Sequence, residues 1–237
     1  MREFKKTSLL GVGFTYASKS EVLEFIITGL QGNIKKYYIV TPNPELLVIA
    51  SDNRDYKDIL NNAKLALIDG IGVLIGAKIV GKVMGQRITG VDLVESLCNR
   101  ISNQPITVGF LGGGPFIAEK TSECLKIKYP GLKVGLVSKE WENSLLNKKI
   151  DILFVAFGSP KQENWIATNL EKIPAKVVIG VGGSFDFISG NVKRAPRVLR
   201  DLGLEWLFRL IIQPWRIKRQ ISLIKFVYLI FKEKFFS

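Results

Sequence analysis

The chain contains no histidine, so the commonest general base and the commonest metal ligand are both missing. Acid–base chemistry near neutral pH must therefore use Asp, Glu, Lys, Tyr or Cys, or give way to electrostatic stabilisation. Asp69 is the first candidate, because it follows the apolar run Leu65–Ile68 and precedes Gly70. A carboxylate in that position can accept the proton of a hydroxyl group, and the alternative is an N-cap for the next helix.

The segment Thr41–Glu45 (TPNPE) places two prolines directly after a predicted strand. The prolines stiffen the turn and fix where Thr41 and Asn43 point, so both side chains are candidates for a ligand site. The alternative is a rigid helix start with Pro44 in its first turn. Both interpretations stay open at this stage.

The glycine run Gly112–Gly114 stands between a predicted strand and a predicted helix. Its backbone could approach an anion such as a diphosphate at the helix N-terminus, or it could be a tight turn only. The spacing does not follow G-x-G-x-x-G, so a dinucleotide fingerprint fits poorly. In Gly158–Glu163 (GSPKQE), Gln162 could hydrogen-bond a sugar or base, whereas Glu163 is expected only to interact with the helix dipole.

Basic residues are concentrated in residues 191–237, where eleven Lys and Arg against three Asp and Glu give +8 (11 − 3) of the formal +13. They alternate with Trp, Phe, Leu and Ile, which is typical of a segment that meets a polyanion or an anionic membrane surface. Arg209, Arg216 and Arg219 would share one helical face, with Pro214 bending the path. Such a cluster suits a diphosphate, and the alternative is an ordinary solvated face.

These candidates need a scaffold that brings them together. Apolar runs alternate with helix-like stretches and end in Gly or Pro turns, which predicts an α/β fold. We expect a Rossmann-like, mostly parallel sheet with helices on both faces, plus a basic amphipathic helical C-terminal appendage. Ligands of such sheets bind at the carboxyl ends of the strands, where the polar and glycine residues collect. The predicted strands are Tyr37–Thr41, Leu65–Ile68, Ile106–Leu111, Leu132–Val137, Asp151–Phe157 and Lys176–Val181.

Composition sets further bounds on the protein. The 237 residues are 47% hydrophobic, which argues against a disordered chain. The composition turns basic near Asn191, which predicts a catalytic core over 1–190 and an appendage over 191–237. We expect a cytoplasmic protein, because the chain has only two cysteines and no apolar leader. No apolar run approaches the roughly 20 residues that span a bilayer, so we expect any membrane contact to be at the surface. With no D-x-D pair and no histidine, we expect neither a metal site nor a cofactor.

Seven segments, taken in order, resemble the WecG/TagA/CpsF family of bacterial glycosyltransferases, and they extend from about residue 40 to 219. The segments are TPNPE (41–45), IDGIGV (68–73), RITGVDL (87–93), FLGGGP (110–115), GSPKQE (158–163), GVGGSFDFISGNVKRAP (180–196) and GLEWLFRL…QPWR (203–216). The resemblance implies an inverting, metal-independent transfer of an N-acetylhexosamine, most often N-acetylmannosamine, from a UDP-sugar. The implied acceptor is undecaprenyl-diphosphate-linked N-acetylglucosamine, in teichoic acid or surface polysaccharide synthesis.

The resemblance also implies roles for individual residues. Asp69 matches the proposed general base, and Thr41 and Asn43 match residues that line its pocket. Asp186 matches a position on the nucleotide side. The other implied site residues are Arg87 and Gln162 in the pocket and Arg209, Arg216 and Arg219 above it.

The expected partners are the UDP-sugar, the polyprenyl-diphosphate-linked acceptor and the inner membrane surface on its cytoplasmic face. A homo-oligomer is the alternative way to cover the apolar surface of the appendage. An isoelectric point near 9.7 also fits a nucleic-acid-binding protein, but that class leaves the strand-end residues unexplained, so we expect no nucleic acid. A nicotinamide-dependent enzyme is disfavoured by the glycine spacing.

Overall fold

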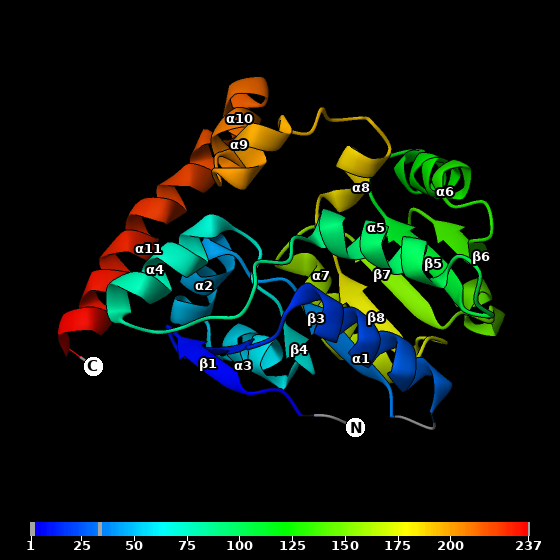
Figure 1. The fold of residues 1–237 in the computed structure, drawn as a ribbon, viewed down its shortest axis with the longest axis horizontal. Coiled ribbons are helices and arrows are strands. Elements are labelled where there is room, and N and C mark those ends of the chain that lie inside the picture. Colours follow the sequence, from blue (N-terminus) through cyan, green and yellow to red (C-terminus); the bar gives the residue numbers. More distant parts are fainter. Residues whose placement is uncertain (1–2, 33–34, 237) are drawn as a thin grey trace.

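The computed structural model describes residues 3–32 and 35–236, without the side chains of residues 216 and 218–220. Its central sheet is formed by β3 (Tyr37–Val40), β4 (Leu65–Ala66), β5 (Thr107–Gly112), β6 (Lys133–Ser138), β7 (Ile152–Ala156) and β8 (Val177–Gly180). The strands pair in parallel in the order β4-β3-β8-β7-β5-β6 (Figure 1). This confirms the predicted fold class, and each predicted strand overlaps an observed one.

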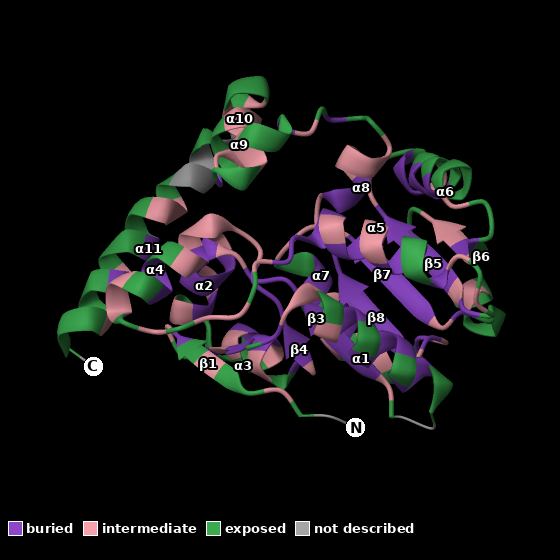
Figure 2. Ribbon diagram, viewed as in Figure 1, coloured by how far each residue is buried: buried purple, intermediate pink, exposed green. Residues whose placement is uncertain are grey.

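Helices cover both faces of the sheet, so its middle strands are apolar throughout. Every residue of β3, β7 and β8 is buried, and Figure 2 shows these strands in purple beneath the helices. One face packs against α1 (Lys19–Gln31), α5 (Gly90–Ile101), α6 (Ile117–Lys128) and α8 (Ser184–Ile188). The other face packs against α2 (Pro44–Asp52), α3 (Arg54–Asn62) and α7 (Lys161–Asn169). Two short 3-10 turns, η1 (Asn143–Asn147) and η2 (Leu170–Lys172), lie in the connections.

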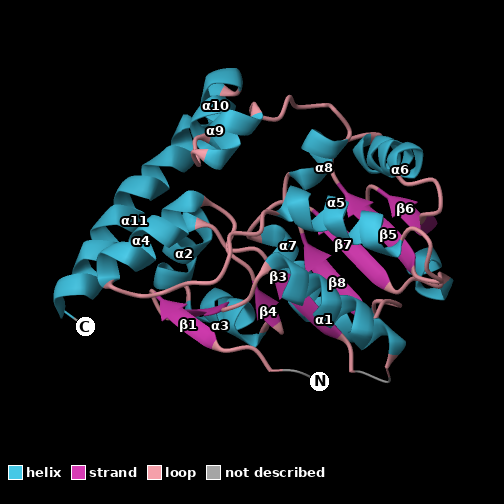
Figure 3. Ribbon diagram, viewed as in Figure 1, coloured by secondary structure: helices cyan, strands magenta, loops and turns pink. Residues whose placement is uncertain are grey.

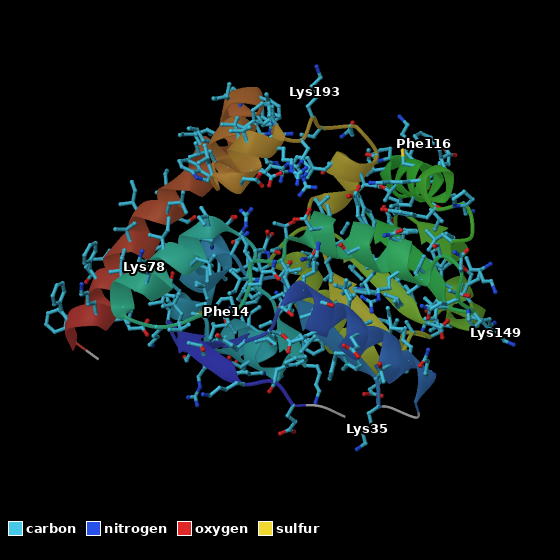
Figure 4. All side chains as sticks on the ribbon, in the orientation of Figure 1. Phe14, Lys35, Lys78, Phe116, Lys149 and Lys193 are labelled. Atoms are coloured by element: carbon cyan, nitrogen blue, oxygen red, sulfur yellow. The ribbon has the colours of Figure 1, made fainter. Side chains whose placement is uncertain are left out.

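An N-terminal hairpin that the sequence did not predict lies beside the edge strand β4. It consists of β1 (Lys6–Leu9) and β2 (Val12–Thr15), which pair antiparallel. Phe14, labelled in Figure 4, is fully buried in the core on the α2 side of the sheet. The Thr15 hydroxyl accepts a hydrogen bond of 3.1 Å from the backbone N–H of Ala66, so the hairpin fixes the short strand that leads to Asp69.

The segment after residue 190 is helical, as predicted, and we call residues 191–236 the appendage. It contains α9 (Arg197–Asp201), α10 (Glu205–Ile212), η3 (Pro214–Arg216) and α11 (Ile217–Phe236). Figures 1 and 3 show it passing from α8 over the carboxyl edge of the sheet and then alongside α4 (Ile71–Val80) towards β1. Among the described helices, none has the length and apolar character that crossing a membrane requires. The boundary at residue 190 stays a prediction.

Among the described side chains of α11, two buried ones and two in ion pairs fasten the helix to the core. Phe226 is 4% exposed and Ile230 is 1% exposed. Both contact α4 at Gly76, where an added Cβ would lie 2.8 Å from Ile230 Cδ1, so α11 can approach this closely only because residue 76 has no side chain. The ion pairs are Lys225 with Asp52 and Lys82 with Glu233.

The three arginines of the appendage that were predicted as site residues lie on three different elements. Pro214 interrupts the helix, since α10 ends at Ile212 and η3 begins at Pro214. Arg209 therefore belongs to α10, Arg216 to η3 and Arg219 to α11. The bend at Pro214 is confirmed. Because the side chains of Arg216 and Arg219 lie outside the described residues, a shared face of the three arginines stays a prediction.

Candidate active site

A cavity of about 1170 Å³ lies at the carboxyl ends of the strands, and we call it the strand-edge cavity. It is lined by the core and by the appendage together. Among the predicted site residues whose side chains are described, nine line it, namely Thr41, Asn43, Asp69, Arg87, Gly113, Gly114, Gln162, Asp186 and Arg209. Parallel strands place their carboxyl ends at one edge of the sheet, so residues far apart in sequence meet here.

Asp69 is held at the cavity by tight packing between two motifs. Its backbone N–H donates to the Pro42 carbonyl at 3.1 Å. Gly70 has φ 112°, a conformation that favours glycine, and a Cβ on Gly72 would lie 2.7 Å from Pro44 Cγ. Helix α4 has Gly70 as its N-cap and no side-chain capping bond, so the alternative that Asp69 caps this helix is wrong.

The electrostatic surroundings of Asp69 favour its protonated form more than water does. The residue keeps part of its surface towards the cavity, yet burial of the carboxyl raises its pKa to about 7. The charge of Glu205, on the appendage, contributes to this rise and Asp92 does so more weakly, whereas Arg87 and Arg209 act to lower the pKa. Asp69 is therefore partly ionised near neutral pH, as a general base requires.

Thr41 and Asn43 lie next to Asp69 with part of their hydrogen-bonding capacity in use. The Thr41 hydroxyl donates to the Gly180 carbonyl at 3.2 Å and so joins the ends of β3 and β8. Asn43 is the N-cap of α2, where its Oδ1 accepts from the Leu46 N–H at 3.1 Å, and the helix begins at Pro44. The rigid helix start is confirmed. Both residues also line the cavity, which is compatible with a ligand role, and that role stays a prediction.

Two arginines bring positive charge to the cavity, one from the core and one from the appendage. The backbone of Arg87 forms an isolated parallel β-bridge with Ile68, next to Asp69. Its side-chain Nη2 donates to the Arg200 carbonyl of α9 at 3.0 Å. Arg209 lies over the Phe187 ring, with its guanidinium carbon 4.7 Å from the ring centre. A Cβ on Gly183 would be 2.9 Å from Arg209 Nη2, so the glycine leaves the space that the guanidinium occupies.

Gln162 and Glu163 form a buried network that the sequence did not predict. Gln162 Oε1 accepts from the Gly182 N–H at 3.0 Å, and Gln162 Nε2 donates to Glu163 at 2.7 Å. Glu163 is fully buried and also accepts from Tyr56 at 3.1 Å and Ser159 at 2.8 Å. Burial raises the pKa of Glu163, although these hydrogen bonds act to lower it. The network positions Gly182. From the sequence we expect only a helix-dipole role for Glu163, which does not account for these hydrogen bonds.

The glycine run has divided roles. Gly113 and Gly114 line the cavity, whereas Gly112 is absent from the described lining. Gly112 has φ 106°, and a Cβ there would lie 2.8 Å from the Ala156 carbonyl carbon, so this glycine permits close approach of β7. Asp186 lines the cavity and accepts from Asn191 Nδ2 at 3.0 Å. Ligand contact by these residues stays a prediction.

Arg194 joins the core to the appendage at the rim of the cavity. Its Nη2 lies 2.7 Å from Asp92 Oδ1 on α5, and its Nε lies 3.3 Å from Glu205 Oε1 on α10. Burial acts to raise the pKa of Asp92, but the hydrogen bonds from Arg194 and Thr89 outweigh it, and this pKa is lowered. Lys193, its neighbour, points away from the protein (Figure 4). The sequence offered one signal only, a basic pair in a proline-containing linker.

The WecG/TagA/CpsF glycosyl transferase family model matches residues 7–237. The chain belongs to this family. The resemblance drawn from the motifs is thereby confirmed, and the protein is a glycosyltransferase. Of the three classes considered from the sequence, family membership favours the transferase over a nucleic-acid-binding protein and over a nicotinamide-dependent enzyme.

Curated relatives of this glycosyltransferase cover most of its length. A protein from Bacillus spizizenii is 36% identical over 207 residues, which are 84% of this chain and 80% of the relative. A protein from Bacillus subtilis is 36% identical over 203 residues, 83% and 79% of the two chains, and one from Staphylococcus aureus is 32% identical over 238 residues, 97% and 93%. Each relative is named N-acetylglucosaminyldiphosphoundecaprenol N-acetyl-beta-D-mannosaminyltransferase.

Two further predictions about the site of this glycosyltransferase remain open. The side chains of Arg216 and Arg219 lie outside the described residues, so their position relative to the cavity stays a prediction. In the part of the chain that is described, no group of three or more His, Cys, Asp or Glu side chains could hold a metal ion. The expectation that no metal takes part remains a prediction about the reaction.

Proposed function

We propose that the protein transfers N-acetylmannosamine, or a related N-acetylhexosamine, from a UDP-sugar to N-acetylglucosamine carried on undecaprenyl diphosphate. The reaction inverts the anomeric centre and needs no metal, and it serves teichoic acid or surface polysaccharide synthesis. The observation that carries the proposal is that Asp69, with its raised pKa, lines one large cavity together with Arg87 and Arg209. The names and coverage of the relatives support this choice of donor sugar and acceptor.

In this mechanism the acceptor hydroxyl lies against Asp69. As its oxygen attacks the anomeric carbon of the donor, the proton passes to the Asp69 carboxylate and the bond from that carbon to the diphosphate oxygen breaks. UDP leaves with the electron pair of that bond. Direct displacement from the opposite face inverts the anomeric configuration, and a base with a pKa of about 7 is matched to neutral pH.

Negative charge develops on the diphosphate as UDP leaves, and guanidinium groups can stabilise it. Arg209 supplies one from the appendage, above the loop that contains Gly183. A positioned electrostatic donor of this kind contributes roughly 10²–10³ in turnover. Arg216 and Arg219 are proposed to join Arg209 when the substrate is bound, and Thr41, Asn43 and Asp186 are proposed to orient the sugars and the nucleotide.

The outer surface of the appendage supports peripheral binding to the cytoplasmic face of the membrane. It exposes large apolar side chains in a basic segment, a combination typical of a helix that lies in the membrane interface. Most of this surface is green in Figure 2. The side chains include Trp206, Leu207, Ile211, Trp215, Ile221, Ile224, Tyr228, Phe231 and Phe235, with Trp215 70% and Ile224 74% exposed. Self-association of the same surface is the alternative cover.

A panel of donors tests the proposal directly. The full-length protein is incubated with a polyprenyl-diphosphate-linked N-acetylglucosamine, a chelator, and in turn UDP-N-acetylmannosamine, UDP-N-acetylglucosamine, UDP-N-acetylgalactosamine and UDP-glucose. We expect transfer from an N-acetylhexosamine donor, foremost UDP-N-acetylmannosamine, and an inverted linkage by NMR of the product. Transfer only after manganese is added would overturn the metal-independent part, and no transfer from any donor would overturn the whole.

A further inference from the structure

The strand-edge cavity has two chemically different ends. At the end next to the strands, the lining carries Asp69, Arg87 and Arg209. The other end lies between α4 and α11, and the lining residues that these two helices contribute are apolar except for Ser222. We call this end the α4–α11 trough, and its apolar side chains are Ile71, Ile75, Ile79, Leu223, Phe226, Val227 and Ile230.

The trough is an open channel with a closed floor. Phe226 and Ile230 form the floor, because both are buried against Gly76. On its walls, Ile75 of α4 and Val227 of α11 remain 53% and 51% exposed although both line the cavity. Two aliphatic side chains on facing helices are thus left open to solvent next to a catalytic cavity, and burying them would be favourable.

Helix α11 has two separate apolar faces. One face lines the trough with residues at helical spacing, Leu223, Phe226, Val227 and Ile230. The second face points outward and is absent from the described lining, and it consists of Ile221, Ile224, Tyr228, Phe231 and Phe235. A helix that only rested on a membrane would need the second face alone. The first face is covered only in part by α4, because Phe226 and Ile230 are buried against Gly76 while Val227 stays 51% exposed, and this open part can take an occupant of its own.

We propose that the α4–α11 trough binds the first isoprene units of the polyprenyl chain of the acceptor. This inference rests on the proposed function, in which the acceptor is a sugar linked through diphosphate to a polyprenyl chain. When the acceptor sugar lies at Asp69, the chain must leave the polar end of the cavity. The apolar lining begins at Ile71, two residues after Asp69, so it offers the chain a continuous apolar path.

This arrangement gives the acceptor one amphipathic site. Its sugar and diphosphate meet Asp69 and the arginines, while its first isoprene units remove water from Ile75 and Val227. One wall belongs to α4 of the core and the other to α11 of the appendage, so the trough exists only while α11 is docked on α4. Binding of the chain would therefore also stabilise the docked appendage, since a ligand stabilises the state that it binds. The competing arrangement is a chain that leaves directly towards the outward face of α11.

Photolabelling tests the occupant without requiring catalysis. The probe is farnesyl diphosphate with a diazirine on its second isoprene unit, used with the full-length protein in detergent-free solution, and labelled residues are identified by mass spectrometry. We expect labels on Ile75, Ile79, Leu223 or Val227, and loss of these labels when unlabelled farnesyl diphosphate competes. Labels confined to Ile221, Ile224, Tyr228, Phe231 and Phe235 would overturn the proposal, because they would place the chain on the outward face.

A chain-length series provides the second, functional test. Acceptors with one, two or three isoprene units are compared in the wild type, in I75S/V227S, and in the matched surface control I221S/I224S. We expect the KM of the wild type to fall by about tenfold or more between one and three units, from the apolar area that the chain buries. The double variant of the trough should lose most of this ratio, and the surface control should keep it.

The outcomes separate this inference from the proposed function. Equal KM ratios in I75S/V227S and the wild type would overturn the trough while leaving the transferase reaction intact. If the wild type transfers sugar to none of the acceptors, the proposed function fails, and the photolabelling alone then decides whether the trough binds an isoprenyl chain.

Discussion

The core and the appendage contribute to one cavity but are held in place very differently. The strand ends that carry Thr41 and Asp69 emerge from a sheet whose middle strands are buried at every residue. On α11, by contrast, only Phe226 and Ile230 are buried among the described side chains, and the outward face is exposed. The difference teaches that the proposed base sits on a rigid scaffold, whereas the opposing cation Arg209 depends on a lightly anchored segment.

The largest effect is expected from the core side of this comparison. Asp69→Asn removes the proton acceptor, and general base catalysis contributes roughly 10²–10⁴ in rate, so we expect turnover to fall by that factor. UDP binding, measured by calorimetry, should be retained. Asp58→Asn is the matched control, because Asp58 is exposed on α3 and is absent from the described cavity lining. Wild-type turnover in Asp69→Asn would remove Asp69 from the mechanism.

Loss of the Phe226 anchor should weaken the docking of the appendage on the core. Phe226→Ala truncates an aromatic side chain that is 4% exposed, and such changes lower the free energy of unfolding by about 3–5 kcal/mol. We expect reduced stability in denaturant titrations together with reduced transfer, because Arg209 loses its fixed position. Tyr228→Ala on the same helix is the control, since Tyr228 is 64% exposed. If both variants behave alike, Phe226 does not anchor the appendage.

On the appendage side, Arg209→Ala should lower kcat by roughly 10²–10³, the effect of one missing electrostatic donor. Arg209→Lys should recover only part of the rate, because an ammonium group cannot reproduce a planar guanidinium over the Phe187 ring. Arg197→Ala is the matched control on the exposed surface of α9, outside the described lining. Steady-state kinetics of the three variants measure this, and equal rates in Arg209→Ala and Arg197→Ala would contradict it.

The buried carboxyl also makes stability depend on pH. The pKa of Asp69 is raised from 3.8 to about 7, so the folded state binds the proton more tightly than the unfolded state. Stability from this group is present below pH 4, falls as pH rises towards 7, and stays low above it, with a total cost of up to about 4 kcal/mol. Asp69→Asn should therefore gain more in Tm at pH 8 than at pH 5. An equal change at both pH values would contradict the raised pKa.

The sequence was sufficient for the sheet because its strands carry an unusual pattern. Continuous apolar runs such as 152–156 must be buried on both faces, and this requires a parallel sheet with helices on each side. The hairpin β1–β2 was missed because four-residue strands with polar members leave a weak signal. For the site, the polar residues at the strand ends were predictable, since parallel topology alone brings Thr41 and Asp69 together.

Other features depend on contacts between distant segments, which local patterns do not encode. Glu233 accepts from the Leu10 N–H at 2.7 Å, a contact that fixes α11 against the N-terminal hairpin. Glu163 resembles an ordinary first-turn acid in sequence, and only its contact with Tyr56 reveals a buried network. The capping alternative for Asp69 failed for a similar reason, because Gly70, with φ 112°, takes the N-cap position itself and α4 begins at Ile71.

The central claim is that charges of the appendage act on the base of the core, and the pH dependence of kcat tests it most directly. The acidic limb should have its midpoint near pH 7 in the wild type. Because Glu205 raises the pKa of Asp69 and Arg209 lowers it, Glu205→Gln should move the midpoint to lower pH and Arg209→Ala should move it to higher pH. Unchanged midpoints in both variants would contradict the account, since the appendage would then have no electrostatic part in the site.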